Sequence, residues 1–125
     1  MVKKILVVDD DKSIVRFLQE ELQKRIPEVE VIATNSGLAA LKTILAGSVD
    51  LLITDIAMPD IDGYELFLRA REIDDNLPVI MMTGFGYDPN HAVVNARRAG
   101  LDDVMFKPFD IVLLEKKVRE KLAII

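Results

Sequence analysis

Five side chains that could do chemistry together stand directly after short apolar runs. They are three carboxylates, one hydroxyl and one ammonium group, on Asp9, Asp10, Asp55, Thr83 and Lys107. Three carboxylates brought close together repel one another unless a positive charge lies among them. Mg²⁺ prefers oxygen ligands and usually binds through one or two carboxylates together with phosphate oxygens. These residue types therefore favour a divalent-cation site, with Lys107 as a second positive charge.

Asp55 is the candidate nucleophile of this set. A carboxylate that attacks phosphorus forms an aspartyl phosphate, and the barrier depends mainly on positioning and on charge at the equatorial phosphoryl oxygens. A divalent cation, the Lys107 ammonium group and the Thr83 hydroxyl could neutralise those oxygens and hydrogen-bond to them. The predicted catalytic residues are therefore Asp55, Thr83 and Lys107.

These side chains can meet only if the apolar runs are neighbouring strands. The runs are continuous rather than alternating, as in ILVV, LLIT and VIMM, which is typical of parallel strands buried on both faces. The expected strands are Ile5–Val8, Val29–Ala33, Leu51–Thr54, Val79–Met82 and a weaker Val104–Phe106.

Segments with helical spacing alternate with these strands. Three one-sided apolar stripes are predicted, at Ile14, Phe17, Leu18 and Leu22, at Leu38, Leu41 and Leu45, and at Leu114, Val118 and Leu122. Two further helices are expected over 64–73 and 90–99, the second closed by Gly100. The predicted N-caps are Asp11 or Ser13, Asn35 or Ser36, and Asp110.

The alternation of strands and helices predicts an α/β fold with an open parallel sheet and helices on both faces. Such sheets place their functional sites at the carboxyl ends of the strands, near the point where the strand order reverses. All five candidate side chains stand at such ends, so the sequence predicts that they converge.

Composition limits the function classes. The 125 residues suit one domain, taken as 1–125, and the 16 basic against 21 acidic residues leave a net charge of −5. An acidic chain argues against direct binding of nucleic acid or an anionic membrane. Cysteine is absent, which excludes disulfides and thiolate chemistry. No apolar run is long enough to span a membrane and no signal peptide is evident, so a cytoplasmic location is expected.

Four sequence blocks together resemble the receiver domain of two-component response regulators. They are ILVVDDD at 5–11, LLITDIAMPDIDG at 51–63, VIMMTG at 79–84 and FKPF at 106–109. The resemblance covers almost the whole chain, and the blocks come in the order and at the spacing of that family. It implies a flavodoxin-like (βα)₅ fold with strand order 2-1-3-4-5 and five helices.

The resemblance also implies roles for particular residues. Asp55 would accept a phosphoryl group from a phosphohistidine, while Asp9, Asp10, Asp55 and the backbone carbonyl of Ala57 would hold Mg²⁺, with Mn²⁺ as an alternative. Thr83 would be the switch hydroxyl, and Lys107, before Pro108, the signature lysine. Gly63 would open the third helix. Such a domain is not an enzyme in its own right, but it assists its own phosphorylation and dephosphorylation.

The implied partners are a histidine kinase or a histidine phosphotransfer protein, and an output domain or effector protein. A monomer or a weak homodimer is expected. The sequence leaves open whether the chain is a complete regulator or a part of a hybrid kinase or multidomain regulator, and its apolar end, LAII, favours the second.

One position departs from the family pattern. The best-studied receivers carry an aromatic residue three positions before the lysine, where this chain has Val104. Phe106 should share a face with Val104 by strand alternation, yet we expect that it does not replace that ring. Thr83 and the loop 84–86, with two glycines, are expected to carry the conformational switch instead.

Three other functions fit the sequence less well. A flavodoxin-type cofactor binder would need phosphate-binding donors where Asp9 and Asp10 stand. A hydrolase of the haloacid dehalogenase type would need an acid at Ala57. A pseudo-receiver that acts only as a protein-interaction module would normally lack one of Asp10, Asp55 or Lys107, and all three are present.

Overall fold

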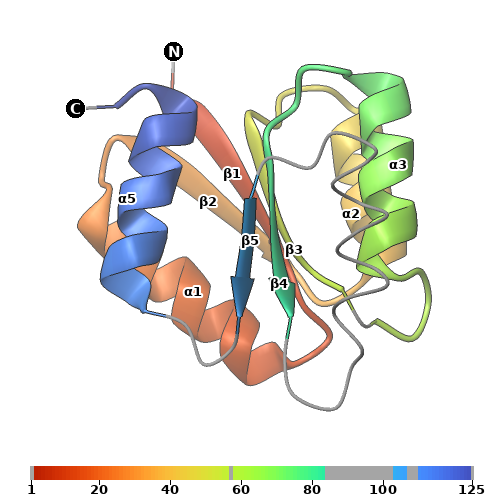
Figure 1. Cartoon of the computed structure of the whole chain (residues 1–125), viewed down its shortest axis with the longest axis horizontal. Coiled ribbons are helices and arrows are strands. Elements are labelled where there is room, and N and C mark those ends of the chain that lie inside the picture. The colour runs from red at the N-terminus through yellow and green to blue at the C-terminus, as the bar shows by residue number, and fades with distance from the viewer. Residues whose placement is uncertain (1, 57, 84–102, 107–109, 125) are drawn as a thin grey trace.

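The computed structural model describes residues 2–56, 58–83, 103–106 and 110–124. Five strands form one parallel sheet in the order β2-β1-β3-β4-β5 (Figure 1). They are β1 (Lys3–Val8), β2 (Val29–Thr34), β3 (Leu51–Asp55), β4 (Val79–Thr83) and β5 (Asp103–Phe106). The predicted strands and their order are confirmed, with ends that differ by one or two residues.

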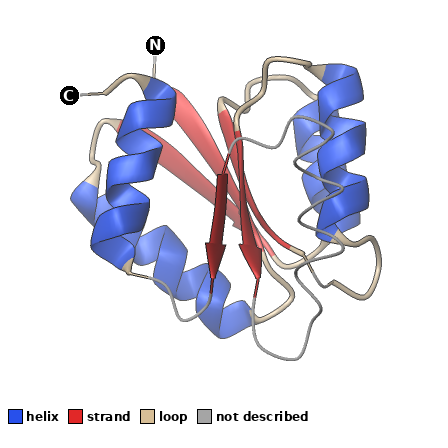
Figure 2. Cartoon of the chain, viewed as in Figure 1, coloured by secondary structure: helices blue, strands red, loops and turns tan. Residues whose placement is uncertain are grey.

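Four helices lie in the described part of the chain, on both faces of the sheet (Figures 1 and 2). They are α1 (Lys12–Arg25), α2 (Gly37–Leu45), α3 (Gly63–Ile73) and α5 (Ile111–Leu122). The helix expected over 90–99, together with Gly100 and His91, lies outside the described residues.

The strands bury both of their faces in two separate cores. Alternate β1 residues belong to different cores, since Leu6 and Val8 pack with α2 and α3, whereas Ile5 and Val7 pack with α1 and α5. This is the two-sided burial that the continuous apolar runs predict. The two cores thus cover both faces of the sheet, while its carboxyl-end edge carries polar groups.

Two of the predicted apolar stripes need correction. On α1 the buried residues are Leu18 and Leu22, while Phe17 is 49% exposed. On α2 the buried face is Gly37, Ala40 and Ile44, one position before the predicted stripe, and Leu45 is 63% exposed and Leu38 50%.

The physical reason for the shift on α2 is close packing by small residues. A Cβ atom at Gly37 would collide with the side chain of Ile61 and lie 3.0 Å from its carbonyl oxygen. The sheet and the segment that contains Ile61 can therefore approach α2 more closely on the side of Gly37 and Ala40 than on the side of the leucines. Hydrophobic spacing alone cannot tell which of two adjacent stripes will be buried.

Helix starts follow the predicted capping chemistry. Of the alternatives offered, Asp11 caps α1 and Ser36 caps α2, and Asp110 caps α5 as predicted. Each side chain accepts a hydrogen bond from a free N–H group of the first turn. Asp62 caps α3 through the N–H of Glu65 at 2.8 Å. That cap was missed, although D-x-x-E is a known helix-start pattern.

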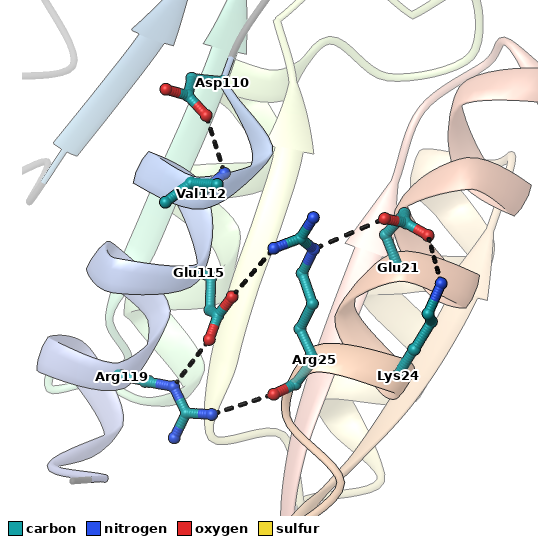
Figure 3. A network of polar contacts seen from close by, with 7 residues as sticks. All are labelled: Glu21, Lys24, Arg25, Asp110, Val112, Glu115 and Arg119. Carbon is teal, nitrogen blue, oxygen red and sulfur yellow. Dashed lines mark hydrogen bonds and ion pairs between the residues drawn. The ribbon is translucent and has the colours of Figure 1, made fainter.

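A polar network joins α1 to α5 at the end of α1 that lies away from Asp11 (Figure 3). Arg119 donates from Nη2 to the carbonyl oxygen of Arg25 at 2.9 Å and from Nε to Glu115 at 3.1 Å. Glu115 also accepts from Arg25 at 3.3 Å, and Arg25 pairs with Glu21 at 3.5 Å. Arg119 thus binds the last turn of α1 and fixes the two helices relative to each other.

Candidate functional site

Three carboxylates meet at the carboxyl ends of β1 and β3. Asp9, Asp10 and Asp55 each offer one oxygen, and these oxygens lie within 4.8 Å of one another. The last β1–β3 register pair is Val8 with Thr54, so Asp9 and Asp55 each stand one residue beyond it on adjacent strands. Strand pairing therefore dictates that these two residues are neighbours, although 46 positions separate them in the sequence.

Asp9 and Asp55 are buried, whereas Asp10 is exposed. The backbone around Asp9 is held on two sides, since its N–H donates to the carbonyl of Thr34 at 3.3 Å and its carboxylate accepts from the N–H of Asp11 at 2.9 Å. Asp11 in turn caps α1. The start of α1 thus orients Asp9 beside the positive end of a helix dipole.

The donor set suits a hard divalent cation. Mg²⁺–oxygen bonds of about 2.0–2.1 Å place the ligand oxygens of an octahedral site roughly 3–4 Å apart. Three carboxylate oxygens within 4.8 Å are close to that arrangement. The cluster has two buried members and one exposed one, so a cation could keep water ligands on the side of Asp10, as Mg²⁺ usually does.

Thr83 ends the adjacent strand β4 and is only 1% exposed. Its neighbour Met82 pairs with Asp55 in the β3–β4 register. Thr83 therefore lies on the adjacent strand, one residue beyond the partner of Asp55. Within the described part of the chain, Oγ1 of Thr83 has no hydrogen-bond partner. A buried hydroxyl without a partner costs about 1–3 kcal/mol. A purely structural residue at this position would avoid that cost.

The chain turns back against Asp55 at the start of α3. Gly63 donates its N–H to the carbonyl of Ile56 at 2.7 Å, and a Cβ atom at position 63 would collide with the carbonyl oxygen of Asp55. Ile56 itself donates to the carbonyl of Met82 at 3.0 Å. The segment after Asp55 is therefore packed tightly against the strand end.

Comparison with known proteins agrees with this geometry. A sequence profile described as the response regulator receiver domain matches residues 5–119. The chain belongs to the response regulator receiver domain family. Receiver domains are the phosphoacceptor domains of two-component signalling systems, and this is the function that the family gives to the chain.

Individual relatives show the same similarity, and they include both longer proteins and proteins of about the same length as this chain. The receiver domain is 38% identical over 109 residues to the alkaline phosphatase synthesis transcriptional regulatory protein PhoP of Bacillus subtilis, covering 87% of this chain and 44% of PhoP. It is 34% identical over 120 residues to the response regulator receiver protein CpdR of Brucella abortus, covering 96% and 97%. The chain thus spans less than half of the first relative and nearly all of the second.

A solved structure gives the same fold. The receiver domain superposes with a TM-score of 0.89 on a CheY-like response regulator receiver domain protein from Methanospirillum hungatei, at 30% identity over 98% of this chain and 95% of that one. The sequence-based recognition of the family and of its fold is therefore confirmed.

The structure places some of the predicted site residues and leaves others undescribed. It brings together Asp9, Asp10 and Asp55 and puts Thr83 on the next strand. Ala57, Lys107, Pro108 and the loop 84–86 lie outside the described residues.

Val104 and Phe106 of β5 stand beside β4 as the register requires. Val104 pairs with Met81 and packs partly buried against the core under α2 and α3. Phe106 pairs with Thr83 and is 59% exposed. Val104 thus packs on the core side of β5. Phe106, the only aromatic residue of this strand, is exposed to solvent next to the buried Thr83.

Asp60 is a residue near the site whose contacts the sequence reasoning did not predict. Its exposed carboxylate accepts hydrogen bonds from the Ser36 hydroxyl at 2.7 Å and from the N–H groups of Leu38 at 3.1 Å, Ile61 at 2.9 Å and Gly37 at 3.3 Å. These donors, the Ser36 hydroxyl first, lower the pKa of Asp60 to about 2. No sequence pattern predicts these contacts, because three of the donors come from a segment more than 20 positions away.

Proposed function

We propose that Asp55 is the phosphoacceptor of this receiver domain. The observation that carries the proposal is the convergence of three carboxylate oxygens within 4.8 Å at the carboxyl-end edge of the sheet. The proposed donor is the phosphohistidine of a histidine kinase or of a histidine phosphotransfer protein. A carboxylate oxygen of Asp55 forms the new bond to phosphorus, and the bond from phosphorus to the imidazole nitrogen breaks with its electron pair staying on the nitrogen.

The residues around Asp55 have distinct proposed roles. Asp9, Asp10, Asp55 and the carbonyl of Ala57 would hold Mg²⁺ or Mn²⁺, which when bound would offset the charge on the phosphoryl oxygens. Thr83 donates its hydroxyl hydrogen to a phosphoryl oxygen, and this gives a partner to a side chain that lacks one in the described structure. Lys107 supplies the second positive charge. In this way the domain assists its own phosphorylation and later dephosphorylation without acting on another substrate.

The phosphorylated domain is proposed to bias a two-state equilibrium through Thr83. The readers of that state would be a partner protein or an output domain. PhoP is more than twice as long as the matched region and CpdR has about the same length, so relatives of both kinds exist. We propose that residues 1–125 act as one receiver unit, as a monomer or weak homodimer, without binding nucleic acid directly.

The proposed setting is the cytoplasm, where histidine kinases present their phosphohistidine. Among the described residues, no helix is long and apolar enough to cross a membrane.

The test is phosphorylation by acetyl phosphate with Mg²⁺, followed by intact-mass measurement. We expect wild type to gain the mass of one phosphoryl group, Asp55→Ala to gain nothing, and Asp75→Ala, an exposed aspartate beyond α3, to behave as wild type. Removal of Mg²⁺ with EDTA should abolish the gain. An unchanged mass in wild type would contradict the proposal and would favour a pseudo-receiver that only binds proteins.

A further inference from the structure

Asp60 joins two segments that flank the carboxylate cluster. On one side lies the chain after the acceptor, residues 58–62, and on the other lies the start of α2 with its N-cap Ser36. Three hydrogen bonds cross between the segments, from the Ser36 hydroxyl and the N–H groups of Gly37 and Leu38, and a fourth from Ile61 keeps the carboxylate in place. One exposed side chain thus ties together segments that are remote in sequence.

The α2 side of this tie leads to Asp9. The hydroxyl of Ser36 donates to Asp60 and accepts from the N–H of Ala39 at 3.2 Å, so both of its functions are used. Two residues earlier, Thr34 accepts the N–H of Ser36 on its hydroxyl at 3.4 Å and the N–H of Asp9 on its carbonyl at 3.3 Å. A short polar path therefore runs from Asp60 through Ser36 and Thr34 to the backbone of Asp9.

The other side of the tie leads to Asp55. Met58 and Ile61 are buried against α2, and a side chain at Gly37 would collide with Ile61. At the end of the segment, Gly63 packs directly on the carbonyl of Asp55. Any movement of residues 58–62 away from α2 would therefore shift the backbone of Asp55.

We propose that Asp60 is a positioning residue, which holds the segment after the acceptor against α2 and thereby sets the spacing of Asp55 relative to Asp9. The inference rests on the proposed function of Asp55. A carboxylate is needed because its two oxygens accept on different sides, with Oδ2 facing Ser36 and Leu38 and Oδ1 facing Gly37 and Ile61. An amide can replace only one of these oxygens as an acceptor.

The test compares Mg²⁺ affinity and phosphorylation rate in three variants. Asp60→Ala removes the tie, Asp60→Asn keeps one acceptor oxygen, and Asp62→Ala is the matched control. Asp62 stands on the same segment and is also exposed, but its carboxylate caps α3 through Glu65. Calorimetric titration with Mg²⁺ measures affinity, and intact mass after acetyl phosphate at saturating Mg²⁺ measures the rate.

We expect Asp60→Ala to weaken Mg²⁺ binding by about tenfold, the size of effect seen when groups that orient metal ligands are removed. Asp60→Asn should have a smaller effect in the same direction and retain part of the rate, and Asp62→Ala should bind Mg²⁺ as wild type does. Urea unfolding of all three variants identifies loss of stability, which would lower the folded fraction without changing the affinity of folded molecules.

Two results would overturn the inference. If both Asp60 variants bind Mg²⁺ and accept the phosphoryl group like wild type, Asp60 serves α2 alone while the proposed role of Asp55 stands. If Asp62→Ala weakens Mg²⁺ binding as much as Asp60→Ala, any disturbance of this segment suffices and the tie has no special role. Failure of wild type to gain mass would instead remove the proposed function itself, and the inference with it.

Discussion

Gly63 packs its α-carbon against the carbonyl group of Asp55, and no side chain fits between them. Gly63 begins α3, and its N–H donates to the carbonyl of Ile56 at 2.7 Å. The first turn of a helix is thereby placed directly beside the proposed phosphoacceptor. The contact explains why a glycine stands at this position even though its backbone does not require a positive φ.

Gly63→Ala should therefore damage both folding and phosphorylation. We expect the free energy of unfolding to fall by about 1–3 kcal/mol, as for other overpacked sites, because the backbone of Asp55 or of α3 must move to admit a methyl group. Urea unfolding and the acetyl phosphate assay measure the two effects.

Gly47→Ala is the control for that change. Gly47 has φ +75° and open space around its Cβ position, so the substitution adds backbone strain of about 1–2 kcal/mol without a collision. It should lower stability and leave the phosphorylation rate of the folded protein unchanged. Equal loss of rate in both glycine variants would contradict a specific contact between Gly63 and Asp55.

Thr83→Val should stabilise the unphosphorylated domain while impairing its response. Valine has nearly the same shape as threonine, and the change removes a buried hydroxyl that has no partner within the described residues. We expect the free energy of unfolding without Mg²⁺ to rise by about 1 kcal/mol. The rate of phosphorylation, or the conformational change that follows it, should fall.

Thr54→Val is the matched comparison on the neighbouring strand. The buried Thr54 hydroxyl donates to the carbonyl of Asp55 at 3.0 Å, so its removal breaks a hydrogen bond and should destabilise the domain by about 1 kcal/mol. Opposite signs for the two substitutions in urea unfolding are the expected result. A destabilising Thr83→Val would mean that its hydroxyl already has a partner in solution.

Acidification should remove the stability that Asp60 contributes. The hydrogen bond from Ser36, followed by those from backbone N–H groups, lowers the pKa of Asp60 from 3.8 to about 2 in the folded protein. Because the folded pKa is the lower one, this contribution is complete above the unfolded pKa of 3.8 and declines as the pH falls toward 2. Its size is limited to about 1 kcal/mol, since the carboxylate is exposed and solvent screens it.

The measurement compares wild type with Asp60→Asn by urea unfolding between pH 6 and pH 3. The stability difference should stay constant down to about pH 4 and then shrink. In a Ser36→Ala background the pH-dependent part of the difference should be smaller, because the main cause of the lowered pKa is gone. A difference that grows on acidification would contradict the assignment.

Arg119→Ala should lower the melting temperature and leave phosphorylation intact. The side chain binds the last carbonyl group of α1 and Glu115 (Figure 3). It also pairs with Glu28, and all of these contacts lie at the end of α1 away from its N-cap Asp11. Arg119→Lys should recover only part of the loss, since an ammonium group cannot reproduce the planar arrangement of donors. Lys116→Ala, at an exposed position of α5, is the control.

Salt provides an independent check on the Arg119 network. Ion pairs at partly exposed positions weaken as ionic strength rises, whereas the hydrogen bond to the Arg25 carbonyl is less affected. The difference in melting temperature between wild type and Arg119→Ala should therefore shrink, but not vanish, between low and high salt. Complete independence of salt would show that the two glutamates contribute nothing.

The amino-acid sequence by itself determined the strands, the sheet class and the identity of the carboxylates. Continuous apolar runs such as ILVV and LLIT can be satisfied only by burial on both faces, and strand ends in such a sheet gather at one edge. The sequence alone therefore predicts that Asp9, Asp10 and Asp55 lie together. Local capping chemistry likewise placed the starts of α1, α2 and α5.

Tertiary structure decided what depends on close approach between remote segments. The buried face of α2 is Gly37, Ala40 and Ile44, while Leu38 and Leu45 are exposed, because Ile61 lies too near for a side chain at position 37. The same approach gives Asp60 its donors from Ser36 and α2. At the end of β4, the fold leaves the Thr83 hydroxyl buried without a partner in the described residues. The hydrophobic periodicity and the residue types indicate which groups are present. The space available to each group is set by the packing of the whole fold.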